Sequence, residues 1–263
     1  MNNERFLDIA VEAAITASNI VMDDFLKIRK PKYKGSIDLV TKTDLESEKI
    51  IKNIILSSYP NHSILAEESG KKKTRSDFLW IIDPIDGTTN FVHGCSPFSI
   101  SIALFYKKEP IVSTILELPN LKLYTAIKDK GAWCEGNSIK CSKTKILKKS
   151  LLVTGFSYNY DYLWEQNMLL FKKLTRASQG VRRFGSAALD ICYVAEGVLD
   201  GFWEYNLNPW DTAAGILIAA EAGCLVSNIK GESFNIYNNS ILVTNKNINK
   251  EIIKVISSVK IDS

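Results

Sequence analysis

The order in which helix-like and strand-like patterns follow one another most constrains how this chain can fold. Apolar side chains recur at helical spacing over residues 6–25, and again over a segment that Thr43 or Asp44 can cap and that Pro60 ends. Strand-like segments dominate from there to residue 127, and short Lys-rich or Pro/Asn turns between the later ones indicate antiparallel neighbours. From residue 150 onward strands and helices alternate, which predicts a layered α/β fold.

The expected elements fill most of the chain. The expected strands are 63–66, 78–82, 99–106, 111–117, 122–127, 150–154, 198–205, 224–227 and 241–244, and the later helices are 163–177, 186–197, 212–222 and 248–259. With 263 residues, the chain is long enough to bury a sizeable core. We interpret it as one compact unit of two joined lobes. Residues 1–140 form an N-terminal α+β lobe and residues 141–263 a C-terminal α/β lobe, with a soft boundary in the polar stretch around 137–150.

Histidine and cysteine usage excludes several kinds of chemistry. The chain has only two histidines, so a three-histidine zinc site is impossible. We expect His62 in a surface turn and His93 outside the substrate site. The five cysteines are odd in number and widely spaced, which argues against a disulfide framework and for a reducing compartment. Catalysis should therefore depend on carboxylates and on hard cations, which prefer oxygen ligands.

Charge and hydropathy patterns favour a cytoplasmic protein. The net charge of +4 is too mild to predict nucleic-acid binding. The N-terminus is polar, and no apolar run is long enough to span a bilayer. We expect no membrane partner.

The most informative segment is residues 80–91, WIIDPIDGTTNF. An apolar strand delivers Asp83, and a tight turn can aim Asp83 and Asp86 at one point. Gly87 allows a ligand to approach the backbone closely, and Thr88 suits a helix N-terminus, where free N–H groups receive phosphate. Carboxylates for a cation thus stand beside donors for an anion, which is what metal-assisted phosphate-ester hydrolysis needs.

Each acidic piece also has a structural interpretation. D-P-x-D-G is a good turn sequence, and Glu67-Glu68 could lie in a solvated loop. Asp211 and Asp44 could each cap a helix. A carboxylate pair at the end of a strand, and an acid that opens a helix, could equally complete a metal site around Asp83.

Several segments together resemble the inositol monophosphatase family. Residues 83–91 resemble its first signature and residues 210–215, WDTAAG, its second, while 38–44, 66–70 and 185–190 resemble other segments in matching order. The resemblance covers nearly the whole chain. It implies a layered α-β-α-β-α fold of the inositol monophosphatase and fructose-1,6-bisphosphatase type, and a lithium-sensitive, Mg²⁺-dependent homodimer with two or three ions per site.

The resemblance also implies roles for individual residues. The first ion would be held by Glu67, Asp83 and the carbonyl group of Ile85, the second by Asp83, Asp86 and Asp211, and a third through water by Glu68. Thr88, paired with Asp44, would orient the attacking water, so the catalytic set is Thr88, Asp44, Glu67 and Glu68. The backbone N–H groups of Gly87 and Thr88 would hold phosphate. Asp86, Gly185, Ala187, Glu204 and Asp211 would face the substrate, and Ser157 is a weaker candidate.

Two alternatives remain open. The same scaffold hydrolyses fructose 1,6-bisphosphate, histidinol phosphate or 3′-phosphoadenosine 5′-phosphate, although the compact length and Glu204 favour myo-inositol 1-phosphate. A protein of another class, an RNA- or transcription-associated binding protein, would not need so many clustered carboxylates.

Overall fold

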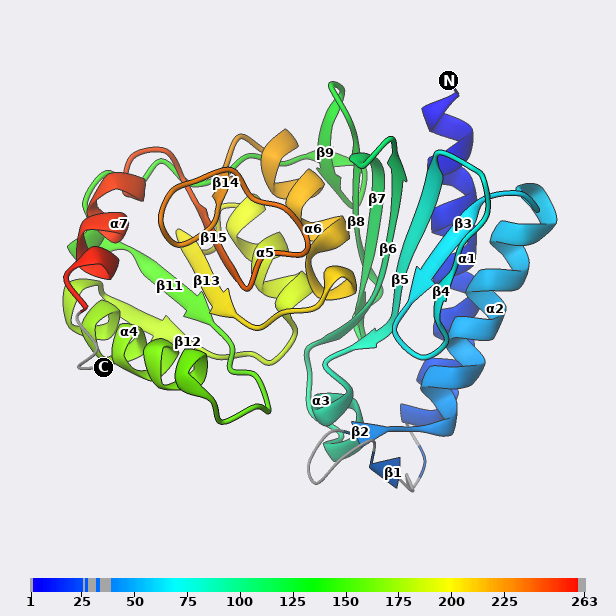
Figure 1. Cartoon of the computed structure of the whole chain (residues 1–263), viewed down its shortest axis with the longest axis horizontal. Helices are drawn as coiled ribbons and strands as arrows, with labels where there is room; N and C mark the ends of the chain where they lie inside the picture. The colour runs from blue at the N-terminus through cyan, green and yellow to red at the C-terminus, as the bar shows by residue number, and fades with distance from the viewer. Residues whose placement is uncertain (1, 26, 28–31, 34–38, 260–263) are drawn as a thin grey trace.

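The computed structural model describes residues 2–25, 27, 32–33 and 39–259, and it has five layers, α-β-α-β-α (Figure 1). Helices α1 (Asn3–Phe25) and α2 (Lys42–Ser58) form the first layer. Helices α5 (Ala187–Ala195) and α6 (Pro209–Glu221) lie between two sheets. Helices α4 (Tyr162–Ala177) and α7 (Asn249–Ser257) cover the far side of the second sheet. The predicted fold class is confirmed.

The first sheet has eight strands in the order β10-β9-β8-β7-β6-β5-β3-β4. Its strands are β3 (Ser63–Ala66), β4 (Gly70–Lys72), β5 (Phe78–Asp86), β6 (Phe98–Tyr106), β7 (Glu109–Leu118), β8 (Lys122–Ile127), β9 (Gly131–Cys134) and β10 (Asn137–Ser138). All neighbours are antiparallel except β3 and β5. The antiparallel arrangement expected for the middle of the chain is confirmed.

The second sheet has five strands in the order β12-β11-β13-β15-β14. They are β11 (Leu151–Thr154), β12 (Gly180–Arg182), β13 (Gly201–Tyr205), β14 (Leu225–Ser227) and β15 (Ser240–Thr244). The remaining short elements are α3 (Thr88–His93), the pair β1 (Lys32–Tyr33) and β2 (Leu39–Val40), and a 3₁₀ turn at Leu147–Lys149. The two sheets are built from sequence on either side of residue 140. The division into lobes at that residue stays an interpretation.

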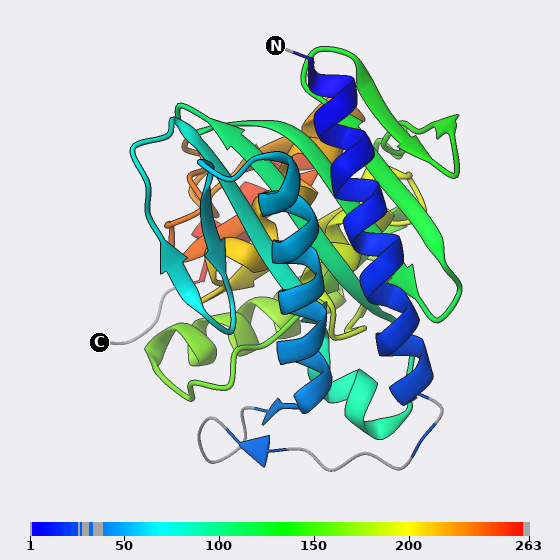
Figure 2. The same ribbon diagram turned by 90° about the vertical axis from the view of Figure 1, so that its right-hand side faces the viewer.

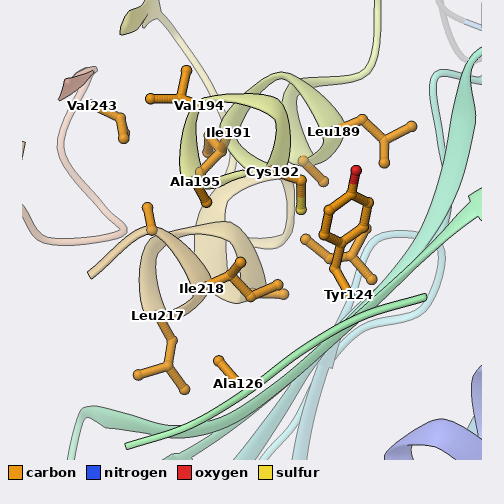
Figure 3. Close-up of a cluster of buried hydrophobic side chains, with 14 of the residues drawn as sticks. Tyr124, Ala126, Leu189, Ile191, Cys192, Val194, Ala195, Leu217, Ile218 and Val243 are labelled. Atoms are coloured by element: carbon orange, nitrogen blue, oxygen red, sulfur yellow. The ribbon is translucent and has the colours of Figure 1, made fainter. Parts of the chain in front are cut away.

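The helices of the outer and middle layers differ as their surroundings require. Helix α1 buries one stripe, including Phe6, Ala10 and Val21, against the first sheet, and Figure 2 shows α1 and α2 lying across that sheet. Helices α5 and α6 are apolar on nearly every side because sheets flank them both. Figure 3 shows their side chains meeting those of the first sheet. A Cβ atom at Gly215 would lie 3.0 Å from Ile191, so glycine permits the close α5–α6 approach.

The start of α2 corrects one expectation. The N-cap is Thr41, not Thr43 or Asp44, and Thr41 accepts hydrogen bonds from the N–H groups of both. Asp44 occupies the third helical position, and its Oδ2 accepts from the Thr41 N–H at 2.8 Å. This reciprocal capping box leaves the other oxygen of Asp44 directed elsewhere. Asp38, in the segment that resembles the family, lies outside the described residues.

Candidate active site

A pocket of about 300 Å³ collects most of the predicted site residues. Those that line it are Glu67, Asp83, Ile85, Asp86, Gly87, Thr88, Gly185, Ala187, Glu204, Asp211 and Ser157. They come from the ends of β3, β5 and β13, from the starts of α3, α5 and α6, and from the loop after β11. Asp44 and Glu68 are not among the lining residues. Asp44 contacts the site through the Thr88 hydroxyl group, as described below.

Asp83 and Asp86 are brought together by a β-bulge, not by the expected tight turn. Strand β5 continues to Asp86, with Asp83 opposite Ser101 and Asp86 opposite Ser99. Three steps along β5 therefore match two along β6, so β5 contains one extra residue. In a regular strand, residues three apart point to opposite faces, and the extra residue brings both carboxylates to one side. The bulge therefore creates the acidic pair.

The carboxylate of Asp86 is anchored by the second half of the chain. Its Oδ2 accepts from the Ser186 hydroxyl at 2.5 Å and from the Ala188 N–H at 2.9 Å, at the start of α5. Ser186 in turn lies 3.4 Å from the hydroxyl oxygen of Ser99 on β6. These bonds fix one oxygen of Asp86 and tie the first sheet to the start of α5 at the pocket.

The predicted pair Thr88 and Asp44 is in contact. The Thr88 hydroxyl oxygen lies 3.2 Å from Asp44 Oδ1 and 3.0 Å from the carbonyl oxygen of Ile85, and both can accept its proton. Burial raises the pKa of Asp44, against hydrogen bonds from Thr41 and Thr88 that lower it. A threonine whose hydroxyl group is fixed by a hydrogen bond to a buried carboxyl group is suited to orient a further polar group in the pocket.

Two glycines are required by the close approach of other groups. Gly87 has φ of +90°, and a Cβ atom there would lie 2.9 Å from the Gly185 carbonyl oxygen. A Cβ atom at Gly155 would lie 2.4 Å from Oε2 of Glu204. The absence of a side chain at Gly155 thus gives Glu204, which is only 5% exposed, the space to enter the pocket.

The carboxyl groups of the pocket oppose one another's ionisation. Burial, followed by the charges of Glu67, Asp86 and Asp211, raises the pKa of Asp83 well above its ordinary value. Burial likewise raises the pKa of Asp86 to about 6, although Ser186 and the N–H of Ala188 favour its charged form. Burial and the charge of Asp86 also raise the pKa of Asp211. Such mutual repulsion at a concave site is a signature of function.

This donor set fits a hard divalent cation. The groups are carboxylates and a backbone carbonyl, the oxygen ligands that Mg²⁺ prefers. A bound cation would relieve the repulsion that raises the pKa of Asp83. In the part of the chain that the structure describes, no three acidic, histidine or cysteine side chains already converge tightly enough to enclose one ion.

Sequence reasoning missed several lining residues. Asp190 is 1% exposed, and neither of its carboxylate oxygens has a hydrogen-bond partner among the described residues. Burial and the charge of Glu204 raise its pKa, while Arg183, also in the lining, lowers it. The hydroxyl groups of Tyr158 and Thr89 lie 2.5 Å apart, bridging the loop after β11 and α3. In the sequence, the one feature that could have drawn attention to Asp190 is its position at the end of residues 185–190, a segment that resembles the family.

Neither histidine contributes to the pocket lining. His62 is half-buried, not at the surface as expected. Its Nδ1 accepts from the Trp80 indole N–H at 3.1 Å, and its ring stacks on Tyr59 and Phe78. His93 is exposed at the end of α3.

No described helix is both long and apolar enough to cross a membrane.

Comparison with known proteins shows which family the chain belongs to. The sequence model of the inositol monophosphatase family matches residues 2–260. The chain belongs to the inositol monophosphatase family. A phosphatase named IMPL1, chloroplastic, from Arabidopsis thaliana is 41% identical, over 95% of this chain and 70% of that protein. An inositol-1-monophosphatase from Synechocystis is 40% identical, over 97% of this chain and 90% of that protein.

Members of the family carry different functional names. A Pasteurella multocida protein named Nus factor SuhB is 36% identical, over 95% of each chain. Among solved structures, the extragenic suppressor protein suhB from Bartonella henselae superimposes with a TM-score of 0.93 at 32% identity, over 97% of this chain and all of that one. Family membership therefore shows the fold and leaves the substrate to be argued from the pocket.

Proposed function

We propose that this protein is a Mg²⁺-dependent phosphomonoesterase that hydrolyses myo-inositol 1-phosphate to inositol and phosphate. The observation that carries the proposal is the pocket itself. Carboxylates of Glu67, Asp83, Asp86 and Asp211 line it together with Gly87, where α3 begins. Groups for a cation and donors for an anion thus share one small space, as phosphoryl transfer to water requires.

The acidic residues would hold the cations. Glu67, Asp83 and the Ile85 carbonyl group would bind one Mg²⁺ ion, and Asp83, Asp86 and Asp211 a second. When bound, Mg²⁺ supplies the charge that lowers the pKa of an attacking water and stabilises the departing alkoxide. Glu68, outside the pocket lining, would act on a third ion only through water.

The chain's other groups would position the reactants. The Thr88 hydroxyl, in contact with buried Asp44, would orient the attacking water. The backbone N–H groups of Gly87 and Thr88 would receive the phosphate oxygens. Because the transition state is loose, such positioning and charge neutralisation carry most of the rate.

The far side of the pocket supports a polyol as the leaving group. Glu204 and Asp190 place buried carboxyl groups there, and Gly185 and Ala187 lie beside them. A buried carboxyl group can hydrogen-bond a hydroxyl group in either protonation state. This lining supports a hydroxyl-rich leaving group, and we favour an inositol monophosphate over fructose 1,6-bisphosphate or 3′-phosphoadenosine 5′-phosphate.

The test is phosphate release by the purified protein with Mg²⁺. The substrates are myo-inositol 1-phosphate, fructose 1,6-bisphosphate, histidinol phosphate and 3′-phosphoadenosine 5′-phosphate, with Asp83→Asn as the control. Preference for the inositol ester would support the full proposal, and preference for another ester would replace the substrate only. Turnover retained by folded Asp83→Asn would refute the cation assignment.

A second candidate function follows from the relative named Nus factor SuhB. A transcription-associated role would require contact with RNA or with a protein that carries it, and the net charge of +4 gives that role little electrostatic support. Salt-dependent retention on immobilised RNA tests it.

We further propose a cytoplasmic homodimer inhibited by Li⁺, to be checked by sedimentation and by titration of the activity with LiCl.

A further inference from the structure

Helix α2 directs one polar face toward the acidic segments of the pocket. Asp44 contacts Thr88 at the start of α3. One turn later the Ser47 hydroxyl donates to the carbonyl oxygen of Pro84 at 3.1 Å, inside the β5 bulge. Glu48 follows on the same face, and it is only 3% exposed. The helix therefore contacts the bulge and carries a buried carboxylate that the proposed mechanism does not use.

Glu48 holds the turn that carries Glu67 and Glu68. This turn, residues 67–69, joins β3 to β4. The Glu67 N–H donates to the Ile82 carbonyl oxygen at 3.2 Å. The next two N–H groups, of Glu68 and Ser69, donate to Glu48 Oε2 at 2.7 and 3.4 Å. One carboxylate from a different element thus satisfies two of the three backbone donors of the turn.

Lys52 completes the arrangement from the next turn of α2. Its Nζ donates to Glu48 Oε1 at 3.1 Å and to the Ser69 hydroxyl oxygen at 2.9 Å. A buried carboxylate is costly unless charged and hydrogen-bonded partners surround it. Here the partners are the ammonium group and the turn itself, so the position of the turn is tied to the position of Glu48.

We propose that Glu48 is a positioning residue that sets the cation affinity of the pocket. By fixing the backbone of Glu68 and Ser69, it aims the adjoining Glu67 carboxylate into the pocket. Glu48 is not among the residues that line the pocket, so it acts through the turn. The inference rests on the proposed function, because that function supplies the cation. Partners that orient metal ligands in this way are typically worth roughly 10- to 100-fold in metal affinity.

The experiment measures Mn²⁺ binding without substrate, by electron paramagnetic resonance of the free ion, in wild type and three variants. Glu48→Gln keeps the shape and removes the charge, and Glu48→Asp keeps the charge and removes the reach. Glu46→Gln is the matched control, because Glu46 lies on the same helix but pairs with exposed Lys42 at 2.9 Å. Thermal unfolding in EDTA establishes that each variant is folded.

We expect the Mn²⁺ dissociation constant to rise roughly 10- to 100-fold in both Glu48 variants and to stay within twofold in Glu46→Gln. At saturating Mg²⁺, the KM for the phosphate ester should stay within about threefold, since the substrate groups are untouched. Unchanged Mn²⁺ affinity in both folded Glu48 variants would overturn the inference while leaving the phosphatase proposal intact. Wild-type protein that binds Mn²⁺ but releases no phosphate would sink the phosphatase proposal alone, and wild-type protein that binds no Mn²⁺ would overturn both.

Discussion

Replacing Gly155 with alanine should selectively weaken recognition of a polyol. The new Cβ atom would lie 2.4 to 2.6 Å from the carboxylate atoms of Glu204, which is too close for any real contact. The backbone of Gly155 cannot retreat easily, because Asn167 Nδ2 donates to its carbonyl oxygen at 2.6 Å. Strand pairing between Glu204 and Ile241 likewise holds the backbone of β13. The Glu204 carboxylate must therefore move.

The magnitude follows from what this carboxylate would lose. A buried polar group left without its hydrogen-bond partner costs about 1–3 kcal/mol, and each 1.4 kcal/mol corresponds to a factor of ten. In Gly155→Ala the KM for myo-inositol 1-phosphate should therefore rise about 5- to 150-fold. An aryl phosphate, which offers no hydroxyl group to Glu204, should show a change of less than about threefold.

Steady-state kinetics with both esters at saturating Mg²⁺ decide the matter. Gly180→Ala is the matched control, because Gly180 also lies in the second sheet and a Cβ atom there would meet nothing closer than 3.3 Å. Equal losses for the two esters would refute the assignment of Glu204 to the hydroxyl groups. An unchanged KM would refute the steric argument.

Three further predictions concern protons, charge and packing. Burial raises the pKa of Asp86 to about 6, so a proton competes with the cation below that pH. The Mg²⁺ concentration that gives half-maximal activity should therefore rise by up to about tenfold for each pH unit below pH 6. A concentration that does not change with pH would contradict this prediction. The pKa of Asp190 is raised by folding, so wild-type stability falls as pH rises from about 3.8 through the folded pKa. The free energy of unfolding of Asp190→Asn, taken relative to wild type, should therefore be higher at pH 8 than at pH 5 by about 1 kcal/mol or more. Urea unfolding in EDTA measures this difference, and an equal value at the two pH values would argue against the prediction. Gly215→Ala places a Cβ atom 3.0 Å from Ile191 and should cost about 1–3 kcal/mol, lowering Tm by about 2–12 °C in calorimetry; an unchanged Tm would mean that α5 and α6 can separate freely.

Local patterns were sufficient to predict most elements and the members of the acidic set. The helical spacing of apolar residues in α1 follows from its single buried face. Strand alternation and turn residues predicted β6 to β8 to within two residues at each end. The placement of Glu67 after a strand and of Asp211 in the first turn of a helix was visible because strand ends and helix starts have sequence signatures. Asp83 was expected just after a strand ending at residue 82, whereas β5 continues through it to Asp86.

What escaped prediction depends on contacts between distant segments. The bulge in β5 needs the register of β6, and a D-P-x-D-G sequence equally predicts a turn. Asp190 fits the interior of an apolar helix pattern poorly, yet nothing local reveals that it reaches the pocket. His62 was placed at the surface because its turn is polar, whereas four aromatic residues from α1, β5 and the end of α2 surround it.

The bonds from Ser186 and Ala188 to Asp86 join parts of the chain about a hundred residues apart. A cation that gathers Asp86, Asp83 and Asp211 would therefore bridge the same seam, because Asp211 also belongs to the second half. By thermodynamic linkage, any change that stabilises the docking of the two halves would raise the affinity for the cation. Cation binding would stabilise the docking by the same free energy. Cation binding and docking of the two halves would then be linked equilibria, so that each could be measured through its effect on the other.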